Sequence, residues 1–422
     1  MNAFILKGTI CYSRSLQELV VQPDGFAVCV DGVSMGVFDR IPAEYQHLPV
    51  LDYGQSLIVP GMVDLHIHAP QYTFRGTGMD LELMDWLQQQ AFPEETRFED
   101  DHYAAAAYEI FARQMKGSAT TRAAVFATRH TPATEILMEK LNVTGLVTYV
   151  GKVNMDQNSI PSLQEESAEA SALATCQWLE QTADRYERCK PILTPRFIPS
   201  CSRFLLEKLQ QIRRQWNLPV QSHLSENPLE IQLVHQLFPE EKSYGHCYER
   251  YGLMDERCIM AHCVYSSAEE VELLKQRGVF VAHCPASNTN LASGIAPVRR
   301  YLEKGLQVGL GSDVAGGHTE SMFRAISDAI QMSKLYWRLV DSSCKPLCFA
   351  EAFFLATMGG GAFFGKVGSF LPGYAFDALV LDEGTMPHWS EFTPRQRLER
   401  YAYLQTGSLG LQAKFVDGKQ IF

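Results

Sequence analysis

The amino-acid sequence predicts an α/β protein, a (β/α)8 barrel with a small β-sandwich domain formed by the N- and C-terminal segments. Three observations predict this architecture. Between residues 59 and 365, short apolar strands alternate with helices, and eight strands are expected there. Both flanking segments instead show short strands separated by turns. The alternative for the middle is a doubly wound sheet, but no Gly-x-Gly-x-x-Gly follows a strand.

The two ends of the chain share a strand-like pattern without helical periodicity. Asp31-Gly32 is a hairpin signal in the first of them. We therefore expect 1–58 and 366–422 to form one small β domain, and 59–365 to form the barrel. The strands predicted in the ends lie at about 5–10, 25–30, 34–39, 376–382 and 415–421.

The middle of the chain carries recognisable strand ends and helix caps. The predicted strands end near His66, Val125, Val153, Arg196, His223, His262, His283 and Ser312. The predicted helix signals are an N-cap at Asp100 or Asp101 with an end before Gly117, capping boxes at Ser162 with Glu165 and at Ser267 with Glu270, and a C-cap at Gly278.

Composition excludes several function classes. The 422 residues include 37 basic and 48 acidic side chains, and the net charge of −11 argues against nucleic acid or an anionic membrane as the main partner. No apolar run reaches the roughly 18 residues of a membrane helix, and the first residues form no secretory signal. The 11 cysteines are irregularly spaced, which favours free thiols in a reducing compartment. We expect a cytoplasmic protein that acts on a small molecule.

Histidines and one aspartate stand where apolar strands end. His66 and His68 are two residues apart, so on a strand both imidazoles project to the same side. His223, His262 and Asp313 end the fifth, sixth and eighth strands. Because the carboxyl ends of barrel strands converge on one face, these five groups are expected to meet. Neutral imidazoles with one carboxylate suit Zn2+, with Fe2+ as the second choice.

One metal ion per chain is expected, because the fourth strand ends without the lysine that would bridge two ions. His66, His68, His223 and Asp313 are predicted to be direct ligands. His262 is either a further ligand or a hydrogen-bond partner of the metal-bound water, and the sequence leaves both roles open.

Glu226 follows His223 by three residues and is predicted to carry protons beside the metal. The alternative is a glutamate at a helix start, since Asn227-Pro228 can open a helix. His283 ends the seventh strand, and a structural role is as compatible with the sequence as a place in the pocket.

Several motifs resemble one known family. Residues 63–68 read Val-Asp-Leu-His-Ile-His, residues 283–288 read His-Cys-Pro-Ala-Ser-Asn, and residues 311–313 read Gly-Ser-Asp. With the strand ends at His223 and His262, they resemble the amidohydrolase superfamily, in its branch of deaminases and chlorohydrolases. Four further segments resemble the members of this branch that deaminate guanine, at 68–72, 83–87 with 92–95, 194–197 and 313–317.

The resemblance covers about residue 58 to the C-terminus. It departs at Arg122, where the family more often has a small residue. This departure is expected to affect packing beneath the metal site and to leave the site itself intact.

The resemblance implies a barrel with one zinc ion, a small β domain from both termini, and a homodimer. It also implies that Gln71, Arg196 and Phe197 hold a purine base. Gln71 offers an acceptor and donors, and Arg196 offers a fork of donors for a carbonyl oxygen or ring nitrogen. Phe197 or Trp86 can stack on the flat ring. The residues expected around the base are His68, Gln71, Trp86, Arg196, Phe197, His223, Glu226 and Asp313.

The reaction implied is hydrolysis of the C2 amine of guanine, which yields xanthine and ammonia. Hydroxide on the zinc ion, available near neutral pH, attacks C2. Asp313 helps to take the proton of the water, and Glu226 protonates the ring nitrogen before a proton reaches the leaving amine. The expected catalytic residues are Glu226, Asp313 and His262.

Three alternatives share part of this pattern. One is another aminohydrolase of the same branch, acting on an adenosine-like, pterin or triazine substrate. A second is a hydrolase that opens cyclic amides, which commonly needs two metals and the missing lysine. The third is a non-catalytic scaffold, which would have lost ligands that this chain keeps.

Overall fold

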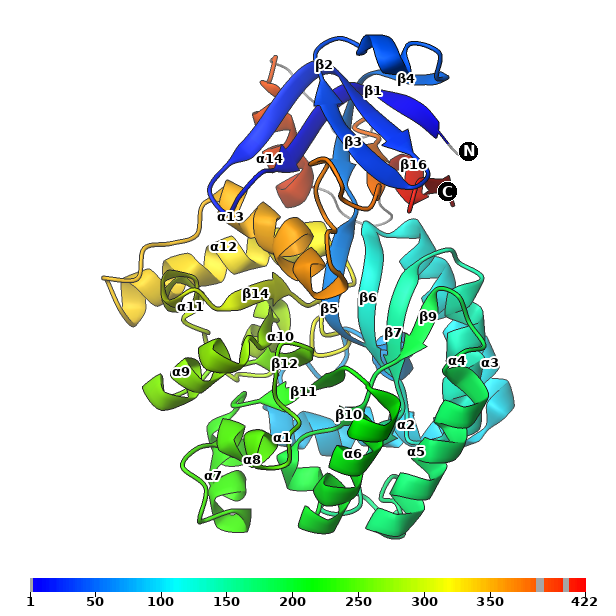
Figure 1. The fold of residues 1–422 in the computed structure, drawn as a ribbon. Helices are drawn as coiled ribbons and strands as arrows, with labels where there is room; N and C mark the ends of the chain where they lie inside the picture. Colours follow the sequence, from blue (N-terminus) through cyan, green and yellow to red (C-terminus); the bar gives the residue numbers. More distant parts are fainter. Residues whose placement is uncertain (1–2, 385–390, 405–409) are drawn as a thin grey trace.

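The computed structural model describes residues 3–384, 391–404 and 410–422. Figure 1 shows a sheet that contains both ends of the chain above a larger α/β body. No helix among the described residues is long and apolar enough to span a membrane.

The sheet at the top of Figure 1 is built from both ends of the chain, as predicted. Asp31 and Gly32 have φ angles of 48° and 81°, which suit the tight hairpin turn predicted there. The strands described in 3–58, 366–384 and 410–422 belong to one seven-stranded sheet, so the two-sheet sandwich of the prediction is not confirmed. In order across the sheet, the strands are β17 (Lys419–Gln420), β16 (Leu411–Val416), β15 (Ala378–Leu381), β4 (Val50–Pro60), β1 (Ala3–Ser13), β2 (Leu19–Val30) and β3 (Val33–Phe38).

The larger body contains two parallel four-stranded sheets and one short strand pair, and its strand ends confirm the predicted positions. The first sheet comprises β5 (Met62–His68), β6 (Thr120–Phe126), β7 (Val147–Gly151) and β9 (Cys189–Pro191). The second comprises β11 (Val220–Leu224), β12 (Cys258–His262), β13 (Phe280–His283) and β14 (Gln307–Leu310). The strand pair is β8 (Val153–Asn154) with β10 (Thr194–Pro195).

Backbone hydrogen bonds connect the two four-stranded sheets. On one side, Leu193 N donates to Pro219 O over 2.9 Å, and Gln221 N donates to Leu193 O over 3.0 Å. On the other side, Asp313 N donates to His66 O over 2.8 Å. The strands themselves are grouped in two sheets, and a single closed barrel is not confirmed.

Helices follow most of the parallel strands, which is the βα alternation predicted from the sequence (Figure 1). They are α1 (Leu83–Trp86), α2 (Phe92–Thr96), α3 (Asp101–Gly117), α4 (Thr131–Asn142), α5 (Ala168–Thr182), α6 (Arg203–Trp216), α7 (Pro228–Leu237), α8 (Tyr244–Arg250), α9 (Ala268–Arg277), α10 (Pro285–Asn290), α11 (Val298–Lys304), α12 (Met322–Leu339), α13 (Phe349–Phe354) and α14 (Pro394–Leu404). Shorter 3-10 and π turns are η1 (Ala43–Tyr45), η2 (Ala69–Phe74), η3 (Leu87–Ala91), η4 (Arg97–Glu99), η5 (Ile198–Ser200), η6 (Leu355–Gly359) and η7 (Ala362–Phe364).

Two of the three predicted helix starts are confirmed. The Asp100 side chain accepts from the backbone N–H groups of His102 and Tyr103, and the Ser267 side chain accepts from Glu270 N at the start of α9. The other half of the capping box predicted at Ser267 is not formed, because the Glu270 carboxylate accepts from Ser225 Oγ over 2.7 Å and from Gly245 N over 2.6 Å instead. Gly278 ends α9 with a φ of 68°, also as predicted.

The capping box predicted at Ser162 with Glu165 is wrong. Helix α5 begins at Ala168, and its N-cap is Ser167. Glu165 is buried and instead forms an ion pair with the buried Lys152. A local motif was therefore overridden by a tertiary contact.

Arg122, which departs from the family pattern, connects the two parts of the fold through ion pairs. From β6, its Nε donates to Asp377 Oδ2 over 2.8 Å, and one Nη donates to Asp417 Oδ1 over 2.5 Å. Asp417 also pairs with Arg188 over 2.9 Å. The Asp377 side chain is fully buried, so its charge depends on Arg122 for compensation.

Replacing Arg122 by alanine is expected to destabilise the fold by about 3–5 kcal/mol, because a buried carboxylate would lose its cation. Denaturant unfolding of the Arg122→Ala variant measures this change. The matched control is Arg14→Ala, which breaks an exposed pair with Glu18 and should change stability little. Equal, small effects of both variants would show that the buried network does not hold the two parts together.

Candidate metal centre and adjoining cavity

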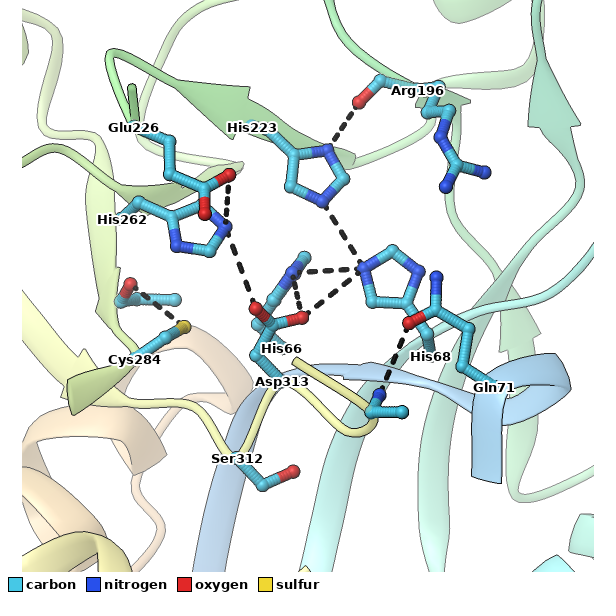
Figure 2. Close-up of polar contacts among 12 residues, drawn as sticks. His66, His68, Gln71, Arg196, His223, Glu226, His262, Cys284, Ser312 and Asp313 are labelled. Carbon is cyan, nitrogen blue, oxygen red and sulfur yellow. Dashed lines mark hydrogen bonds and ion pairs between the residues drawn. The ribbon is translucent and has the colours of Figure 1, made fainter. Parts of the chain in front are cut away.

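The five predicted metal-site residues meet at the carboxyl ends of β5, β11, β12 and β14. Figure 2 shows His66, His68, His223, His262 and Asp313 pointing toward one another. Four of them are buried, and His223 is half-buried with its ring packed against those of His66, His68 and His262. The prediction that separate strand ends converge is thus confirmed in position.

Asp64 holds the two edges of this centre together. Its carboxylate accepts from Ser312 Oγ over 2.6 Å, from Ser312 N over 3.0 Å and from His66 N over 3.2 Å. The aspartate of the 63–68 motif therefore fixes β5 against the segment that carries Asp313.

The spacing of the ligand atoms fits a single metal ion. His68 Nε2 lies 3.2 Å from His66 Nε2 and 3.2 Å from His223 Nε2. Asp313 Oδ1 lies 3.2 Å from His66 Nε2 and 3.4 Å from His68 Nε2. Ligands roughly 2.0–2.1 Å from a tetrahedral ion stand roughly 3.3 Å from one another, which matches these separations. Among the described residues, the groups with metal-ligand geometry are His66, His68 and His223, and His66, His262 and Asp313.

Hydrogen bonds at Nδ1 orient two of the imidazoles so that their Nε2 atoms face the candidate metal centre. His223 Nδ1 donates to Arg196 O over 2.5 Å, and His262 Nδ1 donates to Asn288 Oδ1 over 2.8 Å. Each ring then carries its hydrogen on Nδ1 and directs the Nε2 lone pair inward. Asn288 was not predicted as a site residue, although it lies in the 283–288 motif.

Burial favours the neutral form of three candidate ligand histidines. It lowers the pKa of His66, and it lowers the pKa of His68 and of His223 well below the ordinary value. A neutral imidazole is the form that binds a metal, so the site needs little proton release to accept one.

His262 differs from the other histidines in its surroundings. Its Nε2 lies 3.4 Å from Glu226 Oε2 and 3.8 Å from Asp313 Oδ2. It stands between the ligand cluster and Glu226, a position compatible with both roles that the sequence leaves open.

Glu226 is buried at the edge of the centre. Ser293 Oγ donates to its Oε1 over 2.9 Å, and burial raises the pKa of Glu226 to about 7. A carboxyl group in this state can accept and return a proton near neutral pH. Glu226 lies between β11 and α7, whose N-cap is Asn227, so the helix-start alternative describes its neighbour.

A cavity with an empty volume of about 450 Å³ opens onto the ligand cluster. Every residue predicted around the base lines it: His68, Gln71, Trp86, Arg196, Phe197, His223, Glu226 and Asp313. Leu83, Leu87 and Leu291 add apolar wall. The cavity therefore combines aliphatic and aromatic side chains with several polar and ionisable groups, which suits a small flat molecule that carries hydrogen-bonding groups.

Glu95 is a polar residue of this region that the sequence did not single out as a site residue. It is buried in α2 and accepts hydrogen bonds from both Arg196 and Gln71. The only sequence signal was its place in the segment 92–95.

His283 lies outside the cavity lining. It is buried, and burial lowers its pKa to about 3, which suits a neutral structural ring. His102, His235, His246 and His318 also lie outside the lining.

The chain matches the model of the amidohydrolase family over residues 57–413. It is 35% identical to the guanine deaminase of Dictyostelium discoideum, over 90% of this chain and 88% of that protein. It is 33% identical to the guanine deaminase of Escherichia coli K12, over 80% of this chain and 76% of that protein.

Among solved structures, it resembles the guanine deaminase from C. acetobutylicum, with guanine bound in the active site. The TM-score is 0.95, the identity is 41%, and both chains are covered completely. These similarities confirm the resemblance read from the sequence motifs: the chain belongs to the amidohydrolase family, in the group of its guanine deaminases.

Proposed function

We propose that this protein hydrolyses guanine to xanthine and ammonia. The observation that supports the proposal is a single cavity. Its lining includes both the residues expected to bind the base and the candidate metal ligands His68, His223, His262 and Asp313. The C. acetobutylicum relative, which holds guanine in its active site, supports the same substrate.

We propose that one zinc ion is held by His66, His68, His223 and Asp313, with Fe2+ as the second choice. His262 then serves as a further ligand or as a partner of the metal-bound water. A divalent ion at this position supplies Lewis acidity that brings the pKa of bound water to about 7. The separations between ligand atoms support one ion.

The protein's own groups then move the protons. Glu226 is placed to take a proton from water and to deliver it to a ring nitrogen of guanine, which makes C2 more electrophilic. Water adds its oxygen to C2, the C2–N bond breaks, and the amine leaves as ammonia after accepting a proton. Asp313 helps to take a proton from the water, and His262, whose Nε2 lies 3.4 Å from Glu226 Oε2 and 3.8 Å from Asp313 Oδ2, is placed to orient that water.

The base is expected to lie between Trp86 or Phe197 and the polar pair Gln71 and Arg196. The Trp86 ring packs against Phe74, and its Nε1 donates to Thr77 O over 3.3 Å, so its face is held in place.

The finer architecture is also a proposal. Backbone hydrogen bonds on both sides of the two parallel sheets support a closed (β/α)8 barrel over 59–365. The shared seven-stranded sheet supports a separate small domain of 1–58 with 366–422. Exposed apolar side chains on α12 and α14, including Leu339 and Leu404, are compatible with a homodimer. Free cysteines suit a cytoplasmic location.

Ammonia release from the metal-assayed protein tests the proposed function, with guanine, adenine, adenosine and cytosine in parallel. Turnover of guanine in proportion to one zinc per chain is expected. Removing the metal with a chelator should abolish turnover, and adding Zn2+ back should restore it. Turnover of another base would replace guanine by a different substrate of the same branch, and no turnover at full metal occupancy would favour the scaffold alternative.

A further inference from the structure

Glu95 has a buried carboxylate beside the cavity. This carboxylate has no role in the proposed reaction. Its side chain is 3% exposed. Arg196 donates from Nη1 to Glu95 Oε2 over 2.6 Å and from Nη2 to Oε1 over 3.0 Å. Gln71 Nε2 donates to the same Oε1 over 2.8 Å. Glu95 therefore holds both polar side chains that are expected to bind the base.

These contacts determine which atoms Gln71 and Arg196 have left for a ligand. Gln71 Oε1 accepts from Ala315 N over 3.1 Å, while its Nε2 faces Glu95. Turning the amide over would set acceptor against acceptor and donor against donor, so this orientation is fixed. One hydrogen of Gln71 Nε2 and three N–H groups of Arg196 remain, and Arg196 has no acceptor.

We propose that Glu95 is a positioning residue that sets base specificity. By orienting Arg196 and Gln71, it presents hydrogen-bond donors to the edge of a purine that carries acceptors. This inference rests on the proposed function, because it names how the base of that reaction is chosen.

The donors of Arg196 and Gln71 match some purine bases better than others. Along the edge away from C2, guanine carries two acceptors, the O6 oxygen and N7. A purine with an amino group at C6 would set a donor against the donors of Arg196 or Gln71. Buried donors without acceptors are costly, so the site rejects such a base.

The ion pair of Arg196 with Glu95 also favours an uncharged base. The Arg196 side chain is 4% exposed, and its guanidinium is compensated by Glu95. The pair as a whole is neutral, which suits an uncharged base. Without the carboxylate, Arg196 would keep an uncompensated buried charge and Gln71 would lose the partner that fixes its amide.

Glu94 provides a matched control for Glu95. The two residues are neighbours in α2, but Glu94 is outside the cavity lining. It accepts from Thr73 Oγ1 over 2.8 Å and from Arg97 over 3.1 Å. Glu94→Gln and Glu95→Gln are the same chemical change at adjacent positions of α2.

The experiment compares metal-loaded wild type, Glu95→Gln and Glu94→Gln on guanine and on 2,6-diaminopurine. Both bases carry the 2-amino group that leaves, and only the group at C6 differs. Glu95→Gln is expected to raise KM for guanine about 10- to 100-fold with a smaller change in kcat, and to lower the preference for guanine over 2,6-diaminopurine at least about tenfold. Glu94→Gln should keep the wild-type KM and preference.

An unchanged preference and KM in Glu95→Gln would overturn the inference, as would an equal loss of kcat on both bases, which is the result of a purely structural role. If Glu95→Gln does not fold, Glu95→Asp replaces it. The shorter side chain keeps the charge but moves the carboxylate oxygens away from Arg196 and Gln71. The same fall in preference is expected there, and its absence overturns the inference. A wild type inactive on guanine defeats the proposed function, whereas an active wild type with unchanged preference in the variants defeats this inference alone.

Discussion

A Glu226→Gln variant is expected to keep its metal and to lose about 10²- to 10⁴-fold in kcat on guanine. The carboxyl group is buried, and its raised pKa of about 7 allows proton exchange near neutral pH. An amide of the same shape cannot exchange that proton. Glu226 Oε2 lies 3.4 Å from His262 Nε2, but Glu226 belongs to neither group with metal-ligand geometry among the described residues, so the metal should stay bound.

Two measurements on each variant separate the proton-transfer role of Glu226 from damage to the site: kcat and metal content per chain. The control is Glu269→Gln, which changes an exposed glutamate in the first turn of α9 and should leave both unchanged. Near-normal turnover in Glu226→Gln would refute the proton-transfer role, and loss of metal would make Glu226 part of the ligand set.

An Arg196→Ala variant is expected to lose guanine binding far more than metal binding. The side chain supplies the donors to the base and compensates Glu95, so KM for guanine should rise about 100-fold or more. The contact that orients His223 uses the backbone oxygen of Arg196, which alanine retains. The metal content of Arg196→Ala should therefore match that of the wild type.

Arg203→Ala is the matched control for Arg196→Ala. Arg203, the first residue of α6, forms an exposed ion pair with Glu240, away from the cavity lining. Its KM should stay at the wild-type value. Parallel loss of guanine binding and metal in Arg196→Ala would show that the side chain supports the site as a whole.

The sequence predicted the parts of the site that carry a local signal. His66 and His223 lie near the carboxyl ends of their strands and Asp313 follows its strand, and the convergence of strand ends in an α/β fold brings them together. The cap at Asp100 was also local, because its side chain bonds to N–H groups two and three residues ahead.

Residues whose role depends on a distant partner escaped prediction. Glu95 and Glu94 are adjacent and chemically identical, and the contacts with Gln71 and with Arg196, 101 residues away, distinguish Glu95 from its neighbour. Glu165 matched a capping box, but the buried Lys152 needed a counter-charge, and that tertiary demand decided where the carboxylate lies. Sequence patterns cannot state which distant group will compensate a buried charge.

The order of strands in the seven-stranded sheet also affects how the chain folds during its synthesis. β4 lies between β1 and β15, and Val59 pairs with Leu379. During synthesis, β4 therefore leaves the ribosome more than 300 residues before its second neighbour exists. An open strand edge is a template for wrong pairing, so the nascent chain should depend on protection by chaperones until its last strands emerge. For the same reason, a chain shortened before β15 is expected to aggregate rather than to persist as a smaller enzyme.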